Sequence, residues 1–307
     1  MKISEKLKKQ SRVFSFEFYP PKKEEDIPFL KKAVEELKTL SPDFVSITQS
    51  PTALSGLNFA SLSSTLALSG VLKHEFSLEV MAHLTCVTLK NREMLDEAVK
   101  LLKIFGLENV LALRGDSAAV EFEKPIFSRA CELARELKGR GAFDIAAACY
   151  PEKHPEAVSL EADIDNLKRK MDCGASFAIT QLFLDNASYF NFREKCLARS
   201  VSIPIIPGIM PVTGLSQLTN FAERIKVKIP AGLLAALEKL SPADAEAGPE
   251  TKTAIRDFGI AYAAGQCREL LKNGAPGIHF YTLNRSKATS AVLNLVKKEI
   301  KGTANSI

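Results

Sequence analysis

The sequence predicts an α/β fold, a (β/α)8 TIM barrel, from two observations. Short apolar runs rich in β-branched and aromatic residues recur eight times along the 307 residues. The stretches between them have the apolar spacing of amphipathic helices, as in Leu95, Val99 and Leu102. Regular alternation of strand and helix implies parallel pairing through right-handed crossovers, and eight such units match a closed barrel. An open doubly wound sheet is the alternative, because periodicity cannot show closure.

The eight predicted strands are 14–18, 44–48, 78–85, 109–113, 143–149, 177–183, 203–209 and 277–283. The first strand stops at Pro20 and Pro21, since proline cannot donate to a sheet ladder. Helical spacing follows it, and this order repeats up to the seventh strand. The long connection 225–276 then predicts an extra helical insertion before the eighth strand, with helices at 231–240 and 251–272. No linker or internal repeat stands out, so the chain is expected to form a single catalytic domain.

The composition limits the classes of function. A net charge of +5 arises from 41 basic and 36 acidic residues without a long single-sign block, which gives little support for nucleic-acid or membrane binding. No run of about 18 apolar residues is present, and we expect a cytoplasmic protein. The six cysteines form no CxxC pair and the four histidines no HExxH motif, so no metal site is expected. The glycine motifs of Rossmann folds and P-loops are also absent.

Glu17 is the most informative single residue. In a strand, Phe14, Phe16 and Phe18 share one face, so the carboxylate of Glu17 points away from the aromatic packing. It also lies at the carboxyl end of its strand, where parallel barrels carry their active sites. A rim glutamate without a role is the alternative reading. Further polar residues fall at the ends of the later predicted strands: Thr48, His83, Arg114, Gly115, Asp116, Tyr150, His154, Gln181, Tyr281, Asn284 and Arg285.

A second group of polar residues follows the fifth predicted strand. Asp163, Asn166 and Lys170 lie three and four residues apart and share one helix face, with Arg169 beside them. Such a face can hydrogen-bond sugar hydroxyls and pair with phosphate oxygens. A solvated charged face is the alternative.

Seven segments together resemble the methylenetetrahydrofolate reductase family in order and spacing: FSFEFYPP, HLTC, LRGD, YPEKHPEA, ADIDNLKRK, ITQLFLD and HFYTLNR. The resemblance covers about residues 13–299. It implies a TIM barrel that binds FAD noncovalently at the carboxyl face of its strands. It also implies reduction of 5,10-methylenetetrahydrofolate to 5-methyltetrahydrofolate, for one-carbon metabolism and methionine supply, with NADH or NADPH as electron donor.

The resemblance further implies roles for individual residues. Glu17 resembles the general acid that protonates the folate N10, and Asp116 the carboxylate that meets the pterin and tunes the flavin. Gln181, Tyr281 and Arg285 would face the folate, while Gln217 and Phe221 resemble a stacking platform shared by folate and nicotinamide. The residues implied for FAD are Thr48, Gln49, His83, Arg114, Gly115, Asp116, Ser128, Tyr150, His154, Ala157, Asp163, Asn166, Arg169 and Lys170.

One segment departs from the family pattern. Gln49, Ser50 and Pro51 stand where the family has an aromatic residue followed by Gly-Ala, and the stretch 55–64 lacks the family's arginines. This departure predicts a weakened nicotinamide site, and an electron-donor protein partner is the alternative. Other readings left open are a flavin-independent pterin-binding barrel that carries or transfers methyl groups, and a homo-oligomer. The chain stops shortly after its last predicted helix, so no allosteric control by S-adenosylmethionine is expected.

Overall fold

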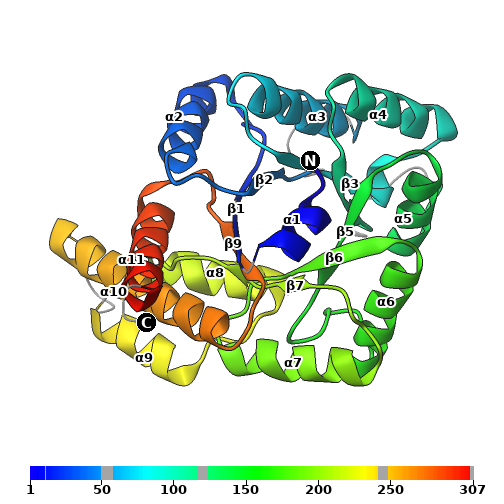
Figure 1. The fold of residues 1–307 in the computed structure, drawn as a ribbon. Coiled ribbons are helices and arrows are strands. Elements are labelled where there is room, and N and C mark those ends of the chain that lie inside the picture. Colours follow the sequence, from blue (N-terminus) through cyan, green and yellow to red (C-terminus); the bar gives the residue numbers. More distant parts are fainter. Residues whose placement is uncertain (11, 50–57, 116–123, 241–247, 305–307) are drawn as a thin grey trace.

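The computed structural model describes residues 1–10, 12–49, 58–115, 124–240 and 248–304. The predicted α/β barrel is confirmed: parallel strands form one sheet in the order β7-β6-β5-β4-β3-β2-β1-β9-β8 (Figure 1). The strands are β1 (Val13–Phe18), β2 (Phe44–Ile47), β3 (Val80–Thr85), β4 (Asn109–Leu113), β5 (Asp144–Cys149), β6 (Ala175–Thr180), β7 (Ile205–Ile206), β8 (Gly208–Ile209) and β9 (Gly277–Tyr281).

Helices flank the strands along the chain, with one before the first strand and one after the last. They are α1 (Ile3–Lys9), α2 (Ile27–Lys38), α3 (Asn58–His74), α4 (Arg92–Ile104), α5 (Ala130–Gly139), α6 (Leu160–Asp172), α7 (Asn186–Ala198), α8 (Leu215–Ile225), α9 (Ala231–Leu240), α10 (Pro249–Lys272) and α11 (Lys287–Ala304). Two short 3-10 turns, η1 (Glu24–Asp26) and η2 (Cys86–Thr88), precede α2 and follow β3. No helix in the described ranges has the length and apolar character needed to cross a membrane.

The predicted seventh strand, 203–209, is wrong as a single strand. The structure divides it into β7, which pairs with β6, and β8, which pairs with β9. Pro207 lies between them and has no N–H to donate, while its carbonyl accepts the N–H of His279 at 2.9 Å. One short segment therefore passes from β6 to β9 and closes the barrel.

Three other strands differ from the prediction by two residues or more at one or both ends. β3 begins two residues later than expected, and β6 runs from Ala175 to Thr180 rather than over 177–183. β9 ends at Tyr281, since Leu283 and Asn284 have φ values of 52° and 56°, which an extended ladder cannot accommodate.

The alternation predicted for the first strand is confirmed. Phe14, Phe16 and Phe18 are buried in the main hydrophobic core shared by the strands and the surrounding helices. Val13 belongs instead to a second cluster with Phe44, Met81 and Phe177, together with Ile3 of α1. Glu17 is thus on the face opposite the phenylalanines, at the end of β1.

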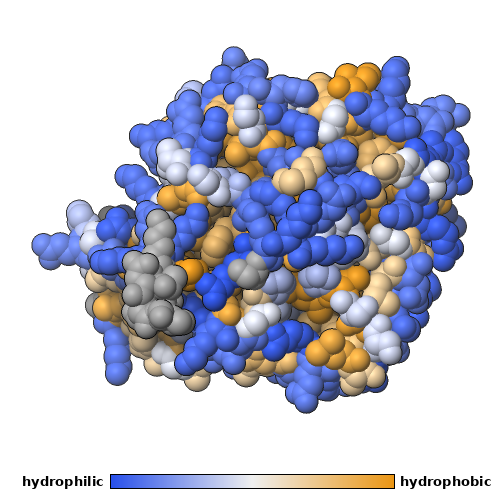
Figure 2. Space-filling model, viewed as in Figure 1, coloured by the Kyte–Doolittle hydropathy of each residue, from blue (hydrophilic) through white to orange (hydrophobic). Residues whose placement is uncertain are grey.

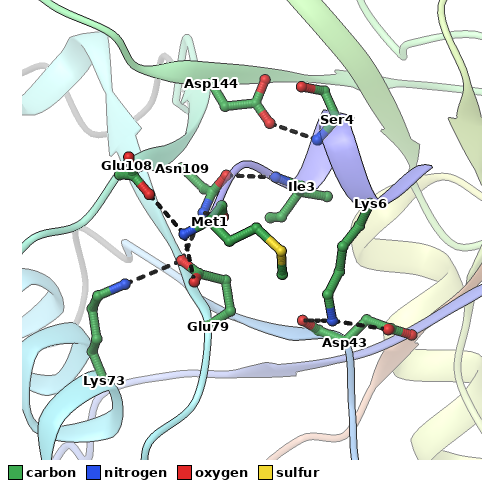
Figure 3. Close-up of polar contacts among 10 residues, drawn as sticks. All are labelled: Met1, Ile3, Ser4, Lys6, Asp43, Lys73, Glu79, Glu108, Asn109 and Asp144. Carbon is green, nitrogen blue, oxygen red and sulfur yellow. Dashed lines mark hydrogen bonds and ion pairs between the residues drawn. The ribbon is translucent and has the colours of Figure 1, made fainter. Parts of the chain in front are cut away.

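Helix α1 was not predicted. It lies across the end of the barrel at which the strands begin, and Figure 3 shows its polar contacts. The backbone N–H of Ile3 donates to Asn109 Oδ1 at 2.9 Å, and that of Ser4 donates to Asp144 Oδ2 at 2.7 Å. Acidic and amide oxygens at a helix N-terminus satisfy donors that the helix itself leaves free.

Ion pairs reinforce the same end of the barrel. The amino group of Met1 lies 2.9 Å from Glu79 and 2.6 Å from Glu108, and Lys6 pairs with Asp43 at 3.0 Å. The acceptors stand just before or at the start of β2, β3, β4 and β5, so α1 ties four strands together. Apart from scattered apolar side chains, the surface on this side is mostly hydrophilic (Figure 2).

The predicted insertion before the last strand is confirmed as α9 and α10, and it packs with α8, the helix that follows β8. These helices share a separate apolar cluster that includes Leu218, Leu233 and Leu237. Helix α10 packs closely against the segment after β8, since a Cβ on Gly259 would lie 1.8 Å from the carbonyl oxygen of Val212. The insertion is therefore held firmly beside the mouth of the barrel.

Candidate active site: two cavities at the mouth of the barrel

Glu17 stands in register with Ser46 of β2 and Tyr281 of β9. Its side chain is 19% exposed, and its Oε2 lies 3.6 Å from Nε2 of both His83 and His279. The hydroxyl of Ser46 donates to the same oxygen at 3.5 Å. One carboxylate is thus enclosed by two imidazoles and a hydroxyl at the carboxyl end of the strands.

The two histidines are buried in different ways. His83 is 5% exposed, and burial lowers its pKa to about 4 against the opposing attraction of Glu17, so its ring is neutral at pH 7. Its Nε2 has no hydrogen-bond partner within the described part of the chain. His279 is held by Ser15, whose Oγ lies 2.7 Å from its Nδ1. Sequence reasoning missed His279, although it lies two residues before Tyr281 and so shares that residue's face of the strand.

The larger cavity, of about 1010 Å³, has Glu17 among its lining residues. Five more of the predicted residues line it as well: Thr48, Phe221, Tyr281, Asn284 and Arg285. Burial, together with the nearby Glu17 charge, raises the pKa of Tyr281, whose hydroxyl donates to the carbonyl of Thr180 at 2.6 Å. Sequence reasoning missed the other cations of this cavity: Lys22, Lys32, Arg224, Arg256 and Lys287.

The second cavity, of about 480 Å³, gathers most residues predicted for the cofactor. Four cations line it, Arg114, Arg129, Arg169 and Lys170, against the two anions Glu156 and Asp163. Its other predicted lining residues are Gln49, Gly115, Ser128, Tyr150, His154, Ala157 and Asn166. The excess of positive charge suits a ligand with two phosphate charges. Arg129 was missed, although it directly follows the predicted Ser128.

Local contacts shape this second cavity. Asp163 Oδ2 accepts the backbone N–H of His154 at 2.8 Å, which holds the loop after β5 against α6. The rings of Tyr150 and His154 meet edge to face, with centroids 4.6 Å apart. Lys170 donates to the carbonyl of Ala148 at 2.8 Å, and burial lowers its pKa.

The Arg114-Gly115 pair, which follows β4, lines the same cavity. Arg114 forms a two-pronged ion pair with Glu156, with N···O distances of 2.6 and 2.8 Å. Gly115 has a φ of +84°, and a Cβ there would lie 2.4 Å from Cγ2 of Val87. Only glycine fits this position without strain.

Several predicted residues lie elsewhere. Gln181 and Gln217 line neither of these two cavities: Gln181 Oε1 accepts the N–H of Leu182, and Gln217 Oε1 accepts from both the N–H and the hydroxyl of Thr213. His83 was predicted for the cofactor but lines neither cavity, and its Nε2 faces Glu17. Thr48, also predicted for the cofactor, lines the larger cavity and not the second one. Asp116 lies outside the described residues, as do positions 50–57, which include Ser50, Pro51 and the first part of the altered stretch 55–64. No cluster of three potential metal ligands occurs among the residues that are described.

The fold and these cavities define a parallel α/β barrel whose strand ends carry two cavities lined by more cations than anions, with a carboxylate facing the larger one. The family model described as methylenetetrahydrofolate reductase matches residues 2–297. The chain belongs to the methylenetetrahydrofolate reductase family.

Individual relatives agree with this assignment. The chain is 37% identical to the 5,10-methylenetetrahydrofolate reductase of Pectobacterium carotovorum subsp. carotovorum and 36% identical to that of Escherichia coli K12, in each case over 91% of this chain and 88% of the relative. It is 32% identical to methylenetetrahydrofolate reductase (NADH) 1 of Arabidopsis thaliana, over 95% of this chain but 50% of the plant enzyme.

A solved structure shares the fold. It is a Clostridium thermocellum protein described as binding two copies of 5-methyl-5,6,7,8-tetrahydrofolic acid, with a TM-score of 0.66. The match covers 96% of this chain and 98% of that one, at 16% identity. At this identity the likeness supports the barrel fold alone.

Proposed function

We propose that this chain reduces 5,10-methylenetetrahydrofolate to 5-methyltetrahydrofolate, with FAD as cofactor and Glu17 as general acid. The observation that carries the proposal is the position of Glu17 in the larger cavity, next to a second cavity with a positive lining. Thr48 and Gln49, neighbours in the chain, line the two cavities, so ligands in both would lie close together. The reaction proposed is the one after which the family is named.

Glu17 is suited to proton transfer by its surroundings. Opening the methylene bridge leaves a folate nitrogen that must gain a proton, and Glu17 would supply it. A neutral imidazole and a hydroxyl can each donate or accept a hydrogen bond. His83 and Ser46 therefore allow the carboxyl group to be protonated before the step and ionised after it. A positioned acid of this kind typically accelerates its step by about 100-fold or more.

The second cavity fits FAD by the chemistry of its donors. Arg114, Arg169 and Lys170 would hold the pyrophosphate, and Asn166 would hydrogen-bond a sugar hydroxyl. When bound, FAD supplies the hydride carrier between the electron donor and the folate. Gly115, which also lines this cavity, lets the backbone pass close to Val87, where a Cβ would collide.

The larger cavity fits a folate along its length. Phe221 and Tyr281 offer aromatic faces beside Glu17, and Arg285 offers a planar fork for the glutamate carboxylate. Lys22 and Lys287 add positive charge to the same lining. Asp116 would meet the pterin, and Gln181 and Gln217 would reach the substrate only after changing the contacts described above.

NADH or NADPH is proposed as the electron donor, with a raised KM. The amide of Gln49 is buried and bonded to Thr85 and Thr88, and it has no aromatic face on which a nicotinamide could stack. A donor protein is the second candidate, favoured by this same feature. Steady-state assays with NADH, NADPH and a low-potential chemical reductant distinguish a nucleotide donor from a donor protein. A KM below about 20 μM for either nucleotide would show that the altered segment after β2 does not weaken nicotinamide binding.

The absorbance spectrum of the purified protein tests the proposal. We expect a flavin spectrum, bleached anaerobically by the electron donor and restored by methylenetetrahydrofolate. Lys170→Ala should raise the Kd for FAD about 10-fold or more, because a charge-assisted bond is worth roughly 1.5 to 3 kcal/mol. Lys168→Ala, on the same helix but outside the cavity lining, is the matched control. A colourless protein that takes up no FAD would refute the proposal.

A further inference from the structure

We infer that Gln49 is a positioning residue for the cofactor cavity, acting through the turn after β3. Its side chain hydrogen-bonds that turn, and the turn contacts the backbone of Arg114 and Gly115 and holds it in place. The inference rests on the proposed function only in naming FAD as the ligand. Gln49 is the residue that stands where the family has an aromatic side chain, and the inference assigns it a structural role.

Gln49 is buried, and its amide joins the end of β2 to two residues at the end of β3 and in the turn after it. Its side chain is 6% exposed, and Oε1 accepts the backbone N–H of Thr85 at 2.7 Å. Its Nε2 donates to the hydroxyl of Thr88 at 3.0 Å. The orientation of the amide is fixed, because the N–H of Thr85 can only donate and so must face the oxygen.

The amide of Gln49 extends the sheet beyond the end of its own strand. In the β2–β3 register the last pair is Ile47 with Ala82, whereas β3 continues to Thr85. The N–H of Thr85 therefore finds its acceptor in a side chain where β2 no longer supplies a carbonyl. A buried N–H left without that acceptor would cost roughly 1 to 3 kcal/mol.

The turn that Gln49 fastens has its own closed set of hydrogen bonds. The hydroxyl of Thr88 donates to the carbonyl of Thr85 at 2.8 Å, and it accepts from Gln49 and from the Thr85 hydroxyl, 3.2 Å away. Its single donor and both lone pairs are thus used. Thr85 and Thr88 are both buried, so each of these bonds is shielded from water.

This turn bears directly on the cofactor cavity. The N–H of Val87 donates to the carbonyl of Arg114 at 3.1 Å. A Cβ on Gly115 would lie 2.4 Å from Val87 Cγ2 and 3.3 Å from Thr85 Cβ, so the turn and Gly115 are in close contact. Arg114, Gly115, Thr85 and Gln49 all line the same cavity. Gln49 therefore couples the ends of β2, β3 and β4 on the cofactor side of the mouth.

The test compares two buried amides at opposite ends of the barrel. Gln49→Met keeps the length of the side chain and removes both polar contacts. Asn109→Leu is the control, since Asn109 is buried and contacts Ile3, Met1 and Glu79 far from the cavity. Both variants are expected to lower the thermal midpoint of the apoprotein. Only Gln49→Met is expected to raise the Kd for FAD, by about 10-fold in a fluorescence titration.

A second variant and a second readout complete the experiment. Thr88→Val removes the hydroxyl that Gln49 Nε2 contacts, at a residue that does not itself line the cavity. It should weaken FAD binding in the same direction, and it tests the inference alone if Gln49→Met does not fold. Hydrogen exchange at Val87 and Gly115 should accelerate in both variants but not in Asn109→Leu. An FAD Kd within twofold of wild type in Thr88→Val and Gln49→Met, or an equal rise in Asn109→Leu, would overturn the inference. Wild-type protein that binds no FAD would overturn the proposed function itself.

Discussion

Acidification is expected to destabilise the protein through His83. Its pKa falls from 6.5 in the unfolded chain to about 4 in the folded protein, chiefly because the ring is buried. Between these two values the unfolded chain binds a proton that the folded protein excludes, so stability decreases as the pH falls. Lowering the pH from 6.5 to about 5, a change of about 1.5 pH units, should therefore lower the free energy of unfolding by about 2 kcal/mol.

The measurement is urea unfolding of the apoprotein at about pH 7.5 and pH 5, for wild type and His83→Gln. The wild type should lose about 2 kcal/mol more than the variant between the two conditions. His74→Gln, the same substitution at an exposed histidine, is the matched control. Equal losses in wild type and His83→Gln would show that the buried ring does not exclude its proton, and the reasoning would fail.

Three further predictions concern catalysis, the cofactor and the fold. Glu17→Gln should slow flavin reoxidation by methylenetetrahydrofolate at least about 100-fold in stopped-flow traces, leaving flavin reduction by the nicotinamide within a fewfold; equal slowing of both half-reactions would make Glu17 structural. Gly115→Ala should lower the thermal midpoint and weaken FAD, because alanine is strained at a φ of +84° and would collide with Val87; unchanged FAD affinity would contradict this. Removing residues 1–10 should lower the free energy of unfolding by at least about 2 kcal/mol, since Ile3 is fully buried; an unchanged urea midpoint would show that α1 adds nothing.

Most of the barrel could be predicted from local pattern. Alternation in the first strand and the two prolines after it were enough to place Glu17 correctly at the end of β1. Helix α1 was missed because seven residues rich in lysine carry no helical apolar period of useful length. The division at Pro207 was also missed, although a proline within a strand pattern is a signal of interruption.

The site was less accessible to sequence reasoning, because its contacts join distant residues. The face of α6 was predictable, since Asp163, Asn166 and Lys170 are related by helical spacing alone. The pairing of Glu17 with His279 joins strands at opposite ends of the chain, and no local pattern encodes it. The use of Gln49 by Thr85 and Thr88 depends on where β2 stops relative to β3, which is a matter of three-dimensional register.

The closure of the barrel has a consequence for biosynthesis. β1 pairs with β9, and Ser15 meets His279 across 264 positions of the chain. While the chain emerges from the ribosome, one edge of β1 stays unpaired until β9 has been translated, and unpaired edges favour aggregation. The acceptors of α1, from Asp43 to Asp144, are all made before β6 to β9 are translated. Docking of α1 can therefore order the nascent half-barrel well before the last strand arrives to close it.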